Sequence, residues 1–373
     1  MFKRRIISLL LVLVFLVMSL SSCAPAKTKA VGAVGEYEVA YEELYFLAFS
    51  YKTGLEAKYG EYEKLDEGKA KQFRDELRGL VYSNIVTNYA ILSLCKEEGL
   101  TLKSDGLADR VDDYVEKFIA TEFKSDKAAY KNSLKQYGMT EHYFRFVSSV
   151  DILYSDLMTK LLEKSDVVND NEKMKDIVKS EFARTWHIAV INDEGESIEQ
   201  NRAKAEEALA KLRDGSMSMY RLIGSQYNED ISITDLDGIY FARGSMDEEY
   251  EKAAFLLEAG EVSDVVETDG AFYVIQRLEI EDAYVEKNLY DLREKYIGSV
   301  IYEKLEKKKN ELKFEPNGFA QGVDIAALEV PEANGLVIAL VLGGAALVIA
   351  GAVVTVILVN KRRARALVER KKK

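Results

Sequence analysis

The 373-residue sequence contains few of the residues that bind metals, form disulfides or interrupt helices: two histidines, two cysteines and three prolines. It also has no HExxH or CxxC motif and no glycine-rich phosphate loop. Metal and nucleotide sites therefore lack support, and we expect no metal and no cofactor. The low proline content suits long, uninterrupted helices. Cys95 falls within the apolar pattern of such a helix, so we interpret it as a packing residue rather than a reactive thiol.

The sequence has a net charge of −12, and positive charge gathers at its two ends. The body between them is therefore more acidic than the chain as a whole. An acidic body argues against nucleic acid as a partner, because the phosphate backbone attracts basic proteins. It also disfavours contact with an anionic membrane surface, and it favours basic or unfolded polypeptides as clients.

The N-terminus has the pattern of an export signal. Three basic residues at positions 3–5 precede an uncharged run over 6–20, and small residues follow. This pattern predicts a secretory signal peptide over residues 1–23. Its end, Leu20-Ser21-Ser22-Cys23, is similar to a bacterial lipobox, so we predict that Cys23 is lipidated. The alternative is an uncleaved N-terminal anchor. A lipidated Cys23 would leave the second cysteine without a disulfide partner.

The C-terminus carries a second membrane signal. Residues 335–359 contain no charge and are long enough, as a helix, to cross a hydrocarbon core of about 30 Å. Residues 360–373 then hold eight Lys and Arg residues against one Glu. The positive-inside rule makes this tail cytoplasmic and places the body of the chain on the extracytoplasmic face of the cell membrane. Residues 314–334, with two prolines, are predicted to be a linker.

Helices are expected on both sides of a central segment. Residues 106–123, 126–138 and 140–164 are predicted helices, and 281–313 forms a further amphipathic helix. That last helix cannot bury its apolar stripe alone, so we expect it to pack on the N-terminal helices. The clearest apolar stripe recurs every three or four residues along one long helix. Its residues are Phe73, Leu77, Val81, Ile85, Tyr89 and Leu92.

The central segment, residues 182–280, changes to short strands and helices. Five pieces follow one another there: an apolar strand with one histidine (183–190), a charged helix (199–214), a polar tetrapeptide (227–230), the pair of stretches 240–246 and 253–257, and a strand–turn–strand (259–275). On the strand, Trp186 should point to the face opposite His187, because side chains alternate.

In this order and spacing, the five pieces resemble a parvulin-type prolyl isomerase domain. Residues 31–43 and 130–162 resemble SurA-like chaperone domains. The two resemblances together imply a PrsA- or SurA-type foldase of the α+β class. A helical SurA-like chaperone domain, made of residues 24–181 and 281–313, would hold an inserted parvulin-like domain with a small antiparallel sheet and helices. A C-terminal transmembrane helix completes the expected architecture.

The parvulin resemblance also implies the site residues. The family has two histidines, an acidic or thiol residue and hydroxyls, beside a pocket for the proline ring. The implied catalytic residues are His187, Asp230, Thr268 and Tyr273, and the implied substrate-binding residues are Met246, Tyr250 and Phe241.

Three positions depart from the family pattern. Tyr273 stands where the family has its second histidine, Gly270 stands where it has a second hydroxyl, and Gly238 lies near its pocket leucine. A tyrosine can exchange one hydrogen bond with His187, but it cannot reproduce a pair of imidazoles. A structural strand histidine is the alternative interpretation of His187. The other histidine, His142, is expected to be solvated on an exposed helix face.

Two functions follow from these features. In the first, the protein catalyses cis-trans isomerisation of X-Pro bonds and holds unfolded exported polypeptides, attached to the membrane through a lipid on Cys23 and through the C-terminal helix. In the second, the parvulin fold is degenerate, and the protein is a non-catalytic holdase. The sequence identifies neither the clients nor the oligomeric state.

Overall fold

The computed structural model describes residues 29–192, 197–230, 233, 237–268 and 270–328. The predicted leader, transmembrane helix and basic tail lie outside the described residues. Among the helices that are described, none combines the length and apolar character needed to span a membrane. The described residues divide into two compact units: residues 29–154 with 307–328, and residues 155–306.

The first unit is mainly helical. Its helices lie close to the positions predicted from the sequence. Asp66 and Asp126 are the N-caps of two of them, and the side chain of each accepts a hydrogen bond from a backbone N–H of the first turn. The helices are α2 (Tyr41–Tyr59), a 3-10 turn η1 (Tyr62–Lys64), α3 (Glu67–Glu97), α4 (Leu107–Phe123), α5 (Lys127–Gln136), the first part of α6 (Glu141–Lys164), the end of α13 (Leu289–Glu311) and α14 (Gly318–Gln321).

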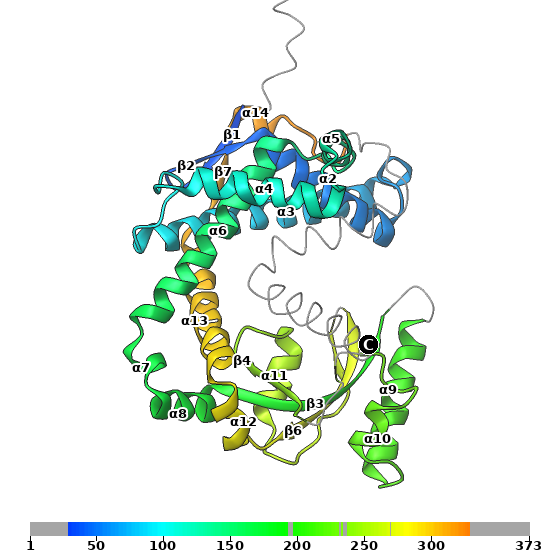
Figure 1. Ribbon diagram of the computed structural model, residues 1–373. Coiled ribbons are helices and arrows are strands. Elements are labelled where there is room, and N and C mark those ends of the chain that lie inside the picture. Colours follow the sequence, from blue (N-terminus) through cyan, green and yellow to red (C-terminus); the bar gives the residue numbers. More distant parts are fainter. Residues whose placement is uncertain (1–28, 193–196, 231–232, 234–236, 269, 329–373) are drawn as a thin grey trace, which may run out of the picture. The chain divides into compact units, whose positions relative to one another are not determined.

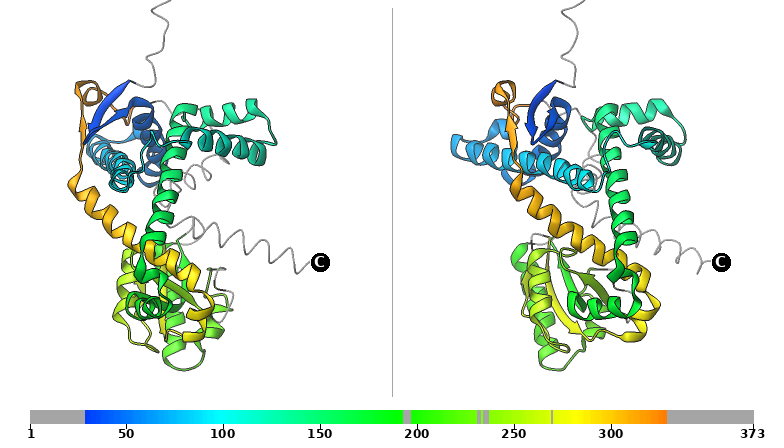
Figure 2. Two further views of the ribbon diagram at one scale, coloured as in Figure 1. Left: turned by 60° about the vertical axis from the view of Figure 1, so that its left-hand side comes forward. Right: turned by 90° about the vertical axis from the view of Figure 1, so that its left-hand side faces the viewer.

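A small antiparallel sheet joins the two sequence-distant parts of this unit. Its strands are β1 (Ala30–Val34), β2 (Tyr37–Ala40) and β7 (Phe314–Pro316), in the order β2-β1-β7. Figure 2 shows the blue and orange strands side by side, and the register pairs Gly32 with Pro316. The first residues of the expected linker 314–334 are thus β7 and α14. The linker prediction missed them because a three-residue strand has no periodicity of its own and depends on its distant partner.

The core of the first unit follows the predicted stripe. All six apolar residues of that stripe are at most 4% exposed along α3, which packs against α2. Cys95 is fully buried on the same helix, so the interpretation as a packing residue is confirmed. His142 is mostly exposed, as expected, but its Nδ1 contacts the buried carboxylate of Glu42.

The second unit is built on a four-stranded antiparallel sheet in the order β4-β3-β6-β5. Its strands are β3 (Phe182–Ile191), β4 (Ile239–Ala242), β5 (Val266–Glu267) and β6 (Ala271–Leu278). Its helices are α7 (Asp166–Asn169), α8 (Asn171–Glu181), α9 (Ile198–Arg213), α10 (Met219–Ile223), α11 (Glu248–Leu256) and α12 (Asp282–Lys287), with the adjoining parts of α6 and α13.

Helices cover both faces of this sheet (Figure 1). Ile188 and Val274 point to α9 and α10, and Trp186 packs against the same cluster. Ala183 and Ile275 point to the opposite face, where α11 lies. Since His187 lies between Trp186 and Ile188 on the strand, its side chain belongs to the α11 face, and the prediction that the tryptophan and the histidine point to opposite faces is confirmed.

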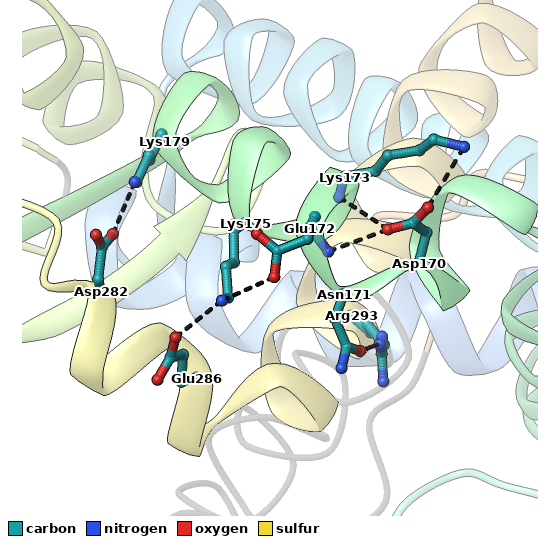
Figure 3. A network of polar contacts seen from close by, with 9 residues as sticks. All are labelled: Asp170, Asn171, Glu172, Lys173, Lys175, Lys179, Asp282, Glu286 and Arg293. Carbon is teal, nitrogen blue, oxygen red and sulfur yellow. Dashed lines mark hydrogen bonds and ion pairs between the residues drawn. The ribbon is translucent and has the colours of Figure 1, made fainter.

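The expected C-terminal helix is two helices. Asn288 donates from its side chain to the carbonyl of Tyr284, and α12 ends there before α13 begins. Figure 3 shows how α12 is joined to α8: Lys175 pairs with Glu286 at 2.8 Å, and Lys179 pairs with Asp282 at 2.8 Å. Near the end of α13, Lys308 pairs with Glu97 of α3 at 2.8 Å.

Candidate functional site

The candidate site is a chain of hydrogen bonds on the α11 face of the sheet. His187 Nε2 lies 3.0 Å from Asp230 Oδ2, and His187 Nδ1 lies 2.9 Å from the Tyr250 hydroxyl. The Tyr250 hydroxyl also lies 2.8 Å from Thr185 Oγ1. His187 is 2% exposed, whereas the Asp230 side chain is 26% exposed. The chain of bonds therefore begins in the core and reaches solvent at the carboxylate.

The polar tetrapeptide 227–230 holds Asp230 in place. β4 pairs only with residues 182–185 of β3. Farther along the same edge of β3, the backbone N–H of Glu229 donates to Ala189 O at 2.8 Å. The Asn228 side chain accepts from Ala189 N at 3.0 Å and donates to Asp230 O at 2.9 Å. These bonds place Asp230 beside His187, two residues earlier on the strand than Ala189.

Aromatic rings surround the histidine. Tyr250 and Tyr273 both meet the imidazole edge-on, at centroid distances of 5.4 and 5.1 Å. Burial raises the pKa of the Tyr250 hydroxyl well above its usual range, so it keeps its proton. Burial also raises the pKa of Tyr273, and the charges of Asp247 and Asp230 add to this effect. Both hydroxyls are therefore neutral and able to donate at physiological pH.

The two remaining predicted pocket residues differ in exposure. Phe241 is 3% exposed and packs on Tyr250, which is fully buried. Met246 is half-buried against the same cluster, and so is Tyr273. Met246 and Tyr273 therefore keep part of their surface exposed, whereas Phe241 and Tyr250 do not.

The loop that carries Met246 is held from two sides. Gly244 has a φ of 77°, and its N–H donates to the Glu251 carboxylate at 2.6 Å. The ring of Tyr302 on α13 lies so close that a Cβ on Gly244 would be 2.2 Å from it. A residue with a side chain does not fit there, and only glycine adopts this φ without strain.

The structure leaves Thr268 away from the histidine. Its hydroxyl donates to Ala271 O and accepts from Ala271 N, closing the turn between β5 and β6. Ala271 pairs with Ile191, four residues along β3 from His187, which is about 13 Å at the rise of a strand. Gly270 lies in the same turn with open space around it. Gly238 packs tightly on the carbonyl of Thr185.

One member of the site was missed by the sequence analysis. Thr185 is fully buried and bonds to Tyr250, yet it was not among the predicted residues. Its spacing of two residues from His187 puts it on the same face of β3, and this was the available signal. The Tyr250 hydroxyl was also missed, because the position was predicted only as part of an apolar pocket.

The arrangement can act on a substrate that is partly apolar and partly polar. Met246 and the ring of Tyr273 can hold an apolar ring, while the carboxylate of Asp230 and the hydroxyl of Tyr273 can meet a polar group beside it. Among the described residues, no group of three or more His, Cys, Asp or Glu side chains could hold a metal ion.

Comparison with family models identifies both parts of the chain. The model of the SurA-like N-terminal domain matches residues 3–158, and the model of the PPIC-type PPIASE domain matches residues 194–294. The chain is a PrsA/SurA-like protein. It has a helical SurA-like N-terminal domain and a PPIC-type parvulin domain with a small antiparallel sheet.

The chain is also similar to individual proteins over part of its length. The chain is 28% identical over 249 residues to the foldase protein PrsA of Bacillus subtilis, covering 64% of this chain and 73% of the relative. It is 27% identical over 201 residues to PrsA of Staphylococcus aureus, covering 52% of this chain and 58% of the relative. The crystal structure of PrsA from Bacillus anthracis aligns with 18% identity over 61% of this chain and 96% of that chain, at a TM-score of 0.31.

Proposed function

We propose that this PrsA/SurA-like protein is a membrane-attached foldase on the extracytoplasmic face of the cell. Its parvulin domain, residues 182–280, would accelerate cis-trans isomerisation of X-Pro bonds in exported proteins. Residues 24–181 and 281–313 would form the chaperone domain that holds unfolded clients. The matches to the SurA-like and PPIC-type family models support this proposal, and the Bacillus subtilis relative bears the name foldase.

The chemistry starts from a slow rotation. The barrier to rotation about a peptide bond is about 18–20 kcal/mol, and an X-Pro bond exchanges in tens to hundreds of seconds. In the planar amide, the oxygen carries partial negative charge and the nitrogen partial positive charge. Both charges decrease as the bond twists and conjugation is lost. A group that disfavours the planar charge distribution, or that binds the freed nitrogen lone pair, therefore lowers the barrier.

The residues of the site fit these two roles. The carboxylate of Asp230 would face the carbonyl oxygen of the residue before proline, where its negative charge destabilises the planar amide more than the twisted one. The neutral hydroxyl of Tyr273 would donate to the proline nitrogen in the twisted state. Met246 would contact the proline ring. His187 is too buried to touch the substrate and would act by holding Asp230.

One observation carries the proposal: a hydrogen-bond chain that begins at buried residues ends in the carboxylate of Asp230, which is 26% exposed and whose charge acts on the half-buried Tyr273. The holdase alternative rests on the absence of a second histidine, since Tyr273 meets His187 with its ring edge-on.

Two assays on the full chain in detergent separate the alternatives. The first measures cis-trans exchange in a short Ala-Pro peptide, and the second measures suppression of aggregation of an unfolded protein without proline-limited folding. A foldase is active in both assays. Activity in the second assay alone would leave the holdase. A well-folded protein that is inactive in both would remove the proposed function altogether.

Membrane attachment is part of the proposal and rests on the sequence. A lipid on Cys23 and a helix over 335–359 would tether both ends, with residues 360–373 in the cytoplasm. Because one acyl chain holds weakly and a transmembrane helix holds firmly, the two anchors should contribute unequally. Cys23→Ala should therefore stay in the membrane fraction through its C-terminal helix, and a chain ending before 335 should be a lipoprotein that is still membrane-associated but held less firmly. Protease added to intact cells should remove the body and spare the tail; digestion of the tail would refute this topology.

A further inference from the structure

The hydrogen bonds around His187 link four side chains in series. Thr185, Tyr250, His187 and Asp230 follow one another at 2.8, 2.9 and 3.0 Å. The first three are at most 2% exposed. Water therefore has little access to either nitrogen of the imidazole, and the partners of those nitrogens are the protein groups themselves.

The series has one consistent direction when the imidazole is neutral. A carboxylate can only accept, so the His187 nitrogen facing Asp230, Nε2, must carry the proton. Nδ1 is then an acceptor, and the hydroxyl of Tyr250 must donate to it. The Tyr250 oxygen in turn can accept from the Thr185 hydroxyl. Every proton in the series thus has one position.

Tyr250 is the residue on which this order depends. Its hydroxyl is neutral because burial raises its pKa, so it can act as the donor at all physiological pH values. Tyr273, which was expected to partner the histidine, instead meets the imidazole edge-on with its ring at an interplanar angle of 79°. A phenylalanine in place of Tyr250 would fill the same space but would leave Nδ1 without this donor.

We infer that Tyr250 and Thr185 are positioning residues that hold His187 as the Nε2–H tautomer, and thereby fix the carboxylate of Asp230 at the site. Neither of them touches the substrate, because both are fully buried. The Thr185 hydroxyl orients the Tyr250 hydroxyl, and the Tyr250 hydroxyl orients the His187 imidazole. The catalytic consequence rests on the proposed isomerase function, but the tautomer does not, because it is a property of the free protein.

The test reads the imidazole nitrogens directly. The full chain in detergent is labelled with ¹⁵N-histidine, and its two histidines are assigned with the variant His142→Gln. Long-range ¹H–¹⁵N spectra should show the His187 ring as the Nε2–H tautomer, with Nδ1 at the chemical shift of a hydrogen-bonded acceptor. An Nδ1–H tautomer in the wild type would overturn the inference.

Two pairs of variants separate the hydroxyls from their bulk. Tyr250→Phe should shift the Nδ1 signal and introduce the second tautomer, whereas Tyr273→Phe should leave both nitrogen shifts unchanged. Thr185→Val should move the Nδ1 signal in the same direction by less, and Thr185→Ser should restore it. The melting temperature of each variant is measured. If Tyr250→Phe does not fold, the comparison of Thr185→Val with Thr185→Ser tests the inference instead. Unchanged nitrogen shifts in the folded Tyr250→Phe or Thr185→Val variant would overturn the inference.

Activity distinguishes this inference from the proposed function. If the wild type accelerates X-Pro exchange, Tyr250→Phe should lower kcat/KM by about tenfold, the effect expected for loss of one buried hydrogen bond. An active Tyr250→Phe variant with wild-type kcat/KM would contradict the positioning role. If the wild type shows the expected tautomer and no isomerase activity, the proposed function fails, while the assignment of Tyr250 and Thr185 to the tautomer stands.

Discussion

Each of the two units holds a carboxylate by hydrogen bonds from buried side chains, but the two carboxylates differ in exposure. In the helical unit, Glu43 on α2 is 1% exposed and accepts from Asn88 Nδ2 at 3.0 Å and from Tyr89 OH at 2.8 Å. In the parvulin unit, Asp230 accepts from His187 and keeps a quarter of its side chain exposed. A carboxylate enclosed on all sides can act only on stability. A carboxylate that is held by a buried side chain and is partly exposed to solvent can also act on a ligand.

The electrostatics of the two carboxylates follow from this difference. Burial raises the pKa of Glu43 to about 7, against the hydrogen bonds from Asn88 and Tyr89, which lower it. Its neighbour Glu42, also buried, raises it further. The helical unit thus carries a buried acid that titrates near neutral pH, and this acid couples its stability to pH. The comparison predicts that changes in the helical unit alter stability, while changes around Asp230 alter rate.

The largest expected effect is a loss of stability in the helical unit. Phe314 on β7 is 8% exposed, and its ring meets Tyr82 at 4.8 Å and covers Gly32. Phe314→Ala should destabilise the helical unit by about 3–5 kcal/mol, as other large-to-small core changes do. Hydrogen exchange in β1 and α3 measures the loss, and Phe319→Ala, whose ring is 37% exposed, is the control. Equal losses in the two variants would refute a structural role for β7.

The second prediction concerns pH. Because the pKa of Glu43 is raised from 4.5 to about 7 on folding, the folded state binds a proton that the unfolded chain has already lost. Glu43 therefore makes the helical unit most stable at or below about pH 4.5, and its contribution is lost as the pH rises to about 7, by up to about 3 kcal/mol. Denaturant unfolding between pH 5 and 8 should show this slope.

The variant Glu43→Gln isolates that slope. It should flatten the pH dependence and be more stable than the wild type at pH 8, provided that the amide keeps the bonds to Asn88 and Tyr89. The exposed Glu38→Gln should retain the wild-type slope. A wild-type slope in Glu43→Gln would show that another group titrates in this interval.

The third prediction tests the loop that carries Met246. Gly244→Ala would force a Cβ against Tyr302 at a φ of 77°, so the loop must move. We expect about a tenfold loss of isomerase rate, since small displacements of positioning groups affect rate strongly. The matched control is Gly260→Ala, where φ is 92° and nothing lies near the added Cβ. Equal losses of rate in both variants would attribute the effect to backbone strain alone.

The sequence predicted these elements unequally well. Periodicity gave the long helix of α3 and the face of β3 that carries His187, because both patterns are local. It could not give β7, because the partner strand β1 is separated from it in sequence by the other elements of both units. It also could not give the hydrogen bond between Tyr250 and His187, because spacing places residues on a face without showing which hydroxyl meets which nitrogen. The turn role of Thr268 was hidden for the same reason.

The smallest expected effect concerns substrate charge. Asp247 follows Met246 directly, and its charge acts on Tyr273. Glu248 and Glu249 are exposed at the start of α11, so the surface around Met246 carries acidic side chains. Peptides with Lys before proline should be isomerised a few times faster than peptides with Glu there, and added salt should reduce the ratio. Asp247→Asn should reduce it too. A ratio that does not respond to salt would rule out an electrostatic origin.

The central claim is that the Asp230 carboxylate, held by His187, lowers the barrier to X-Pro rotation. The most direct test is the cis-trans exchange rate of a Lys-Pro peptide with the wild-type chain and with Asp230→Asn, using the exposed Asp264→Asn as the control. We predict acceleration by the wild type and by the control, and a loss of about 100-fold or more in Asp230→Asn at unchanged melting temperature. A folded wild type that leaves the peptide at its uncatalysed rate, or an Asp230→Asn variant as fast as the wild type, would contradict the claim.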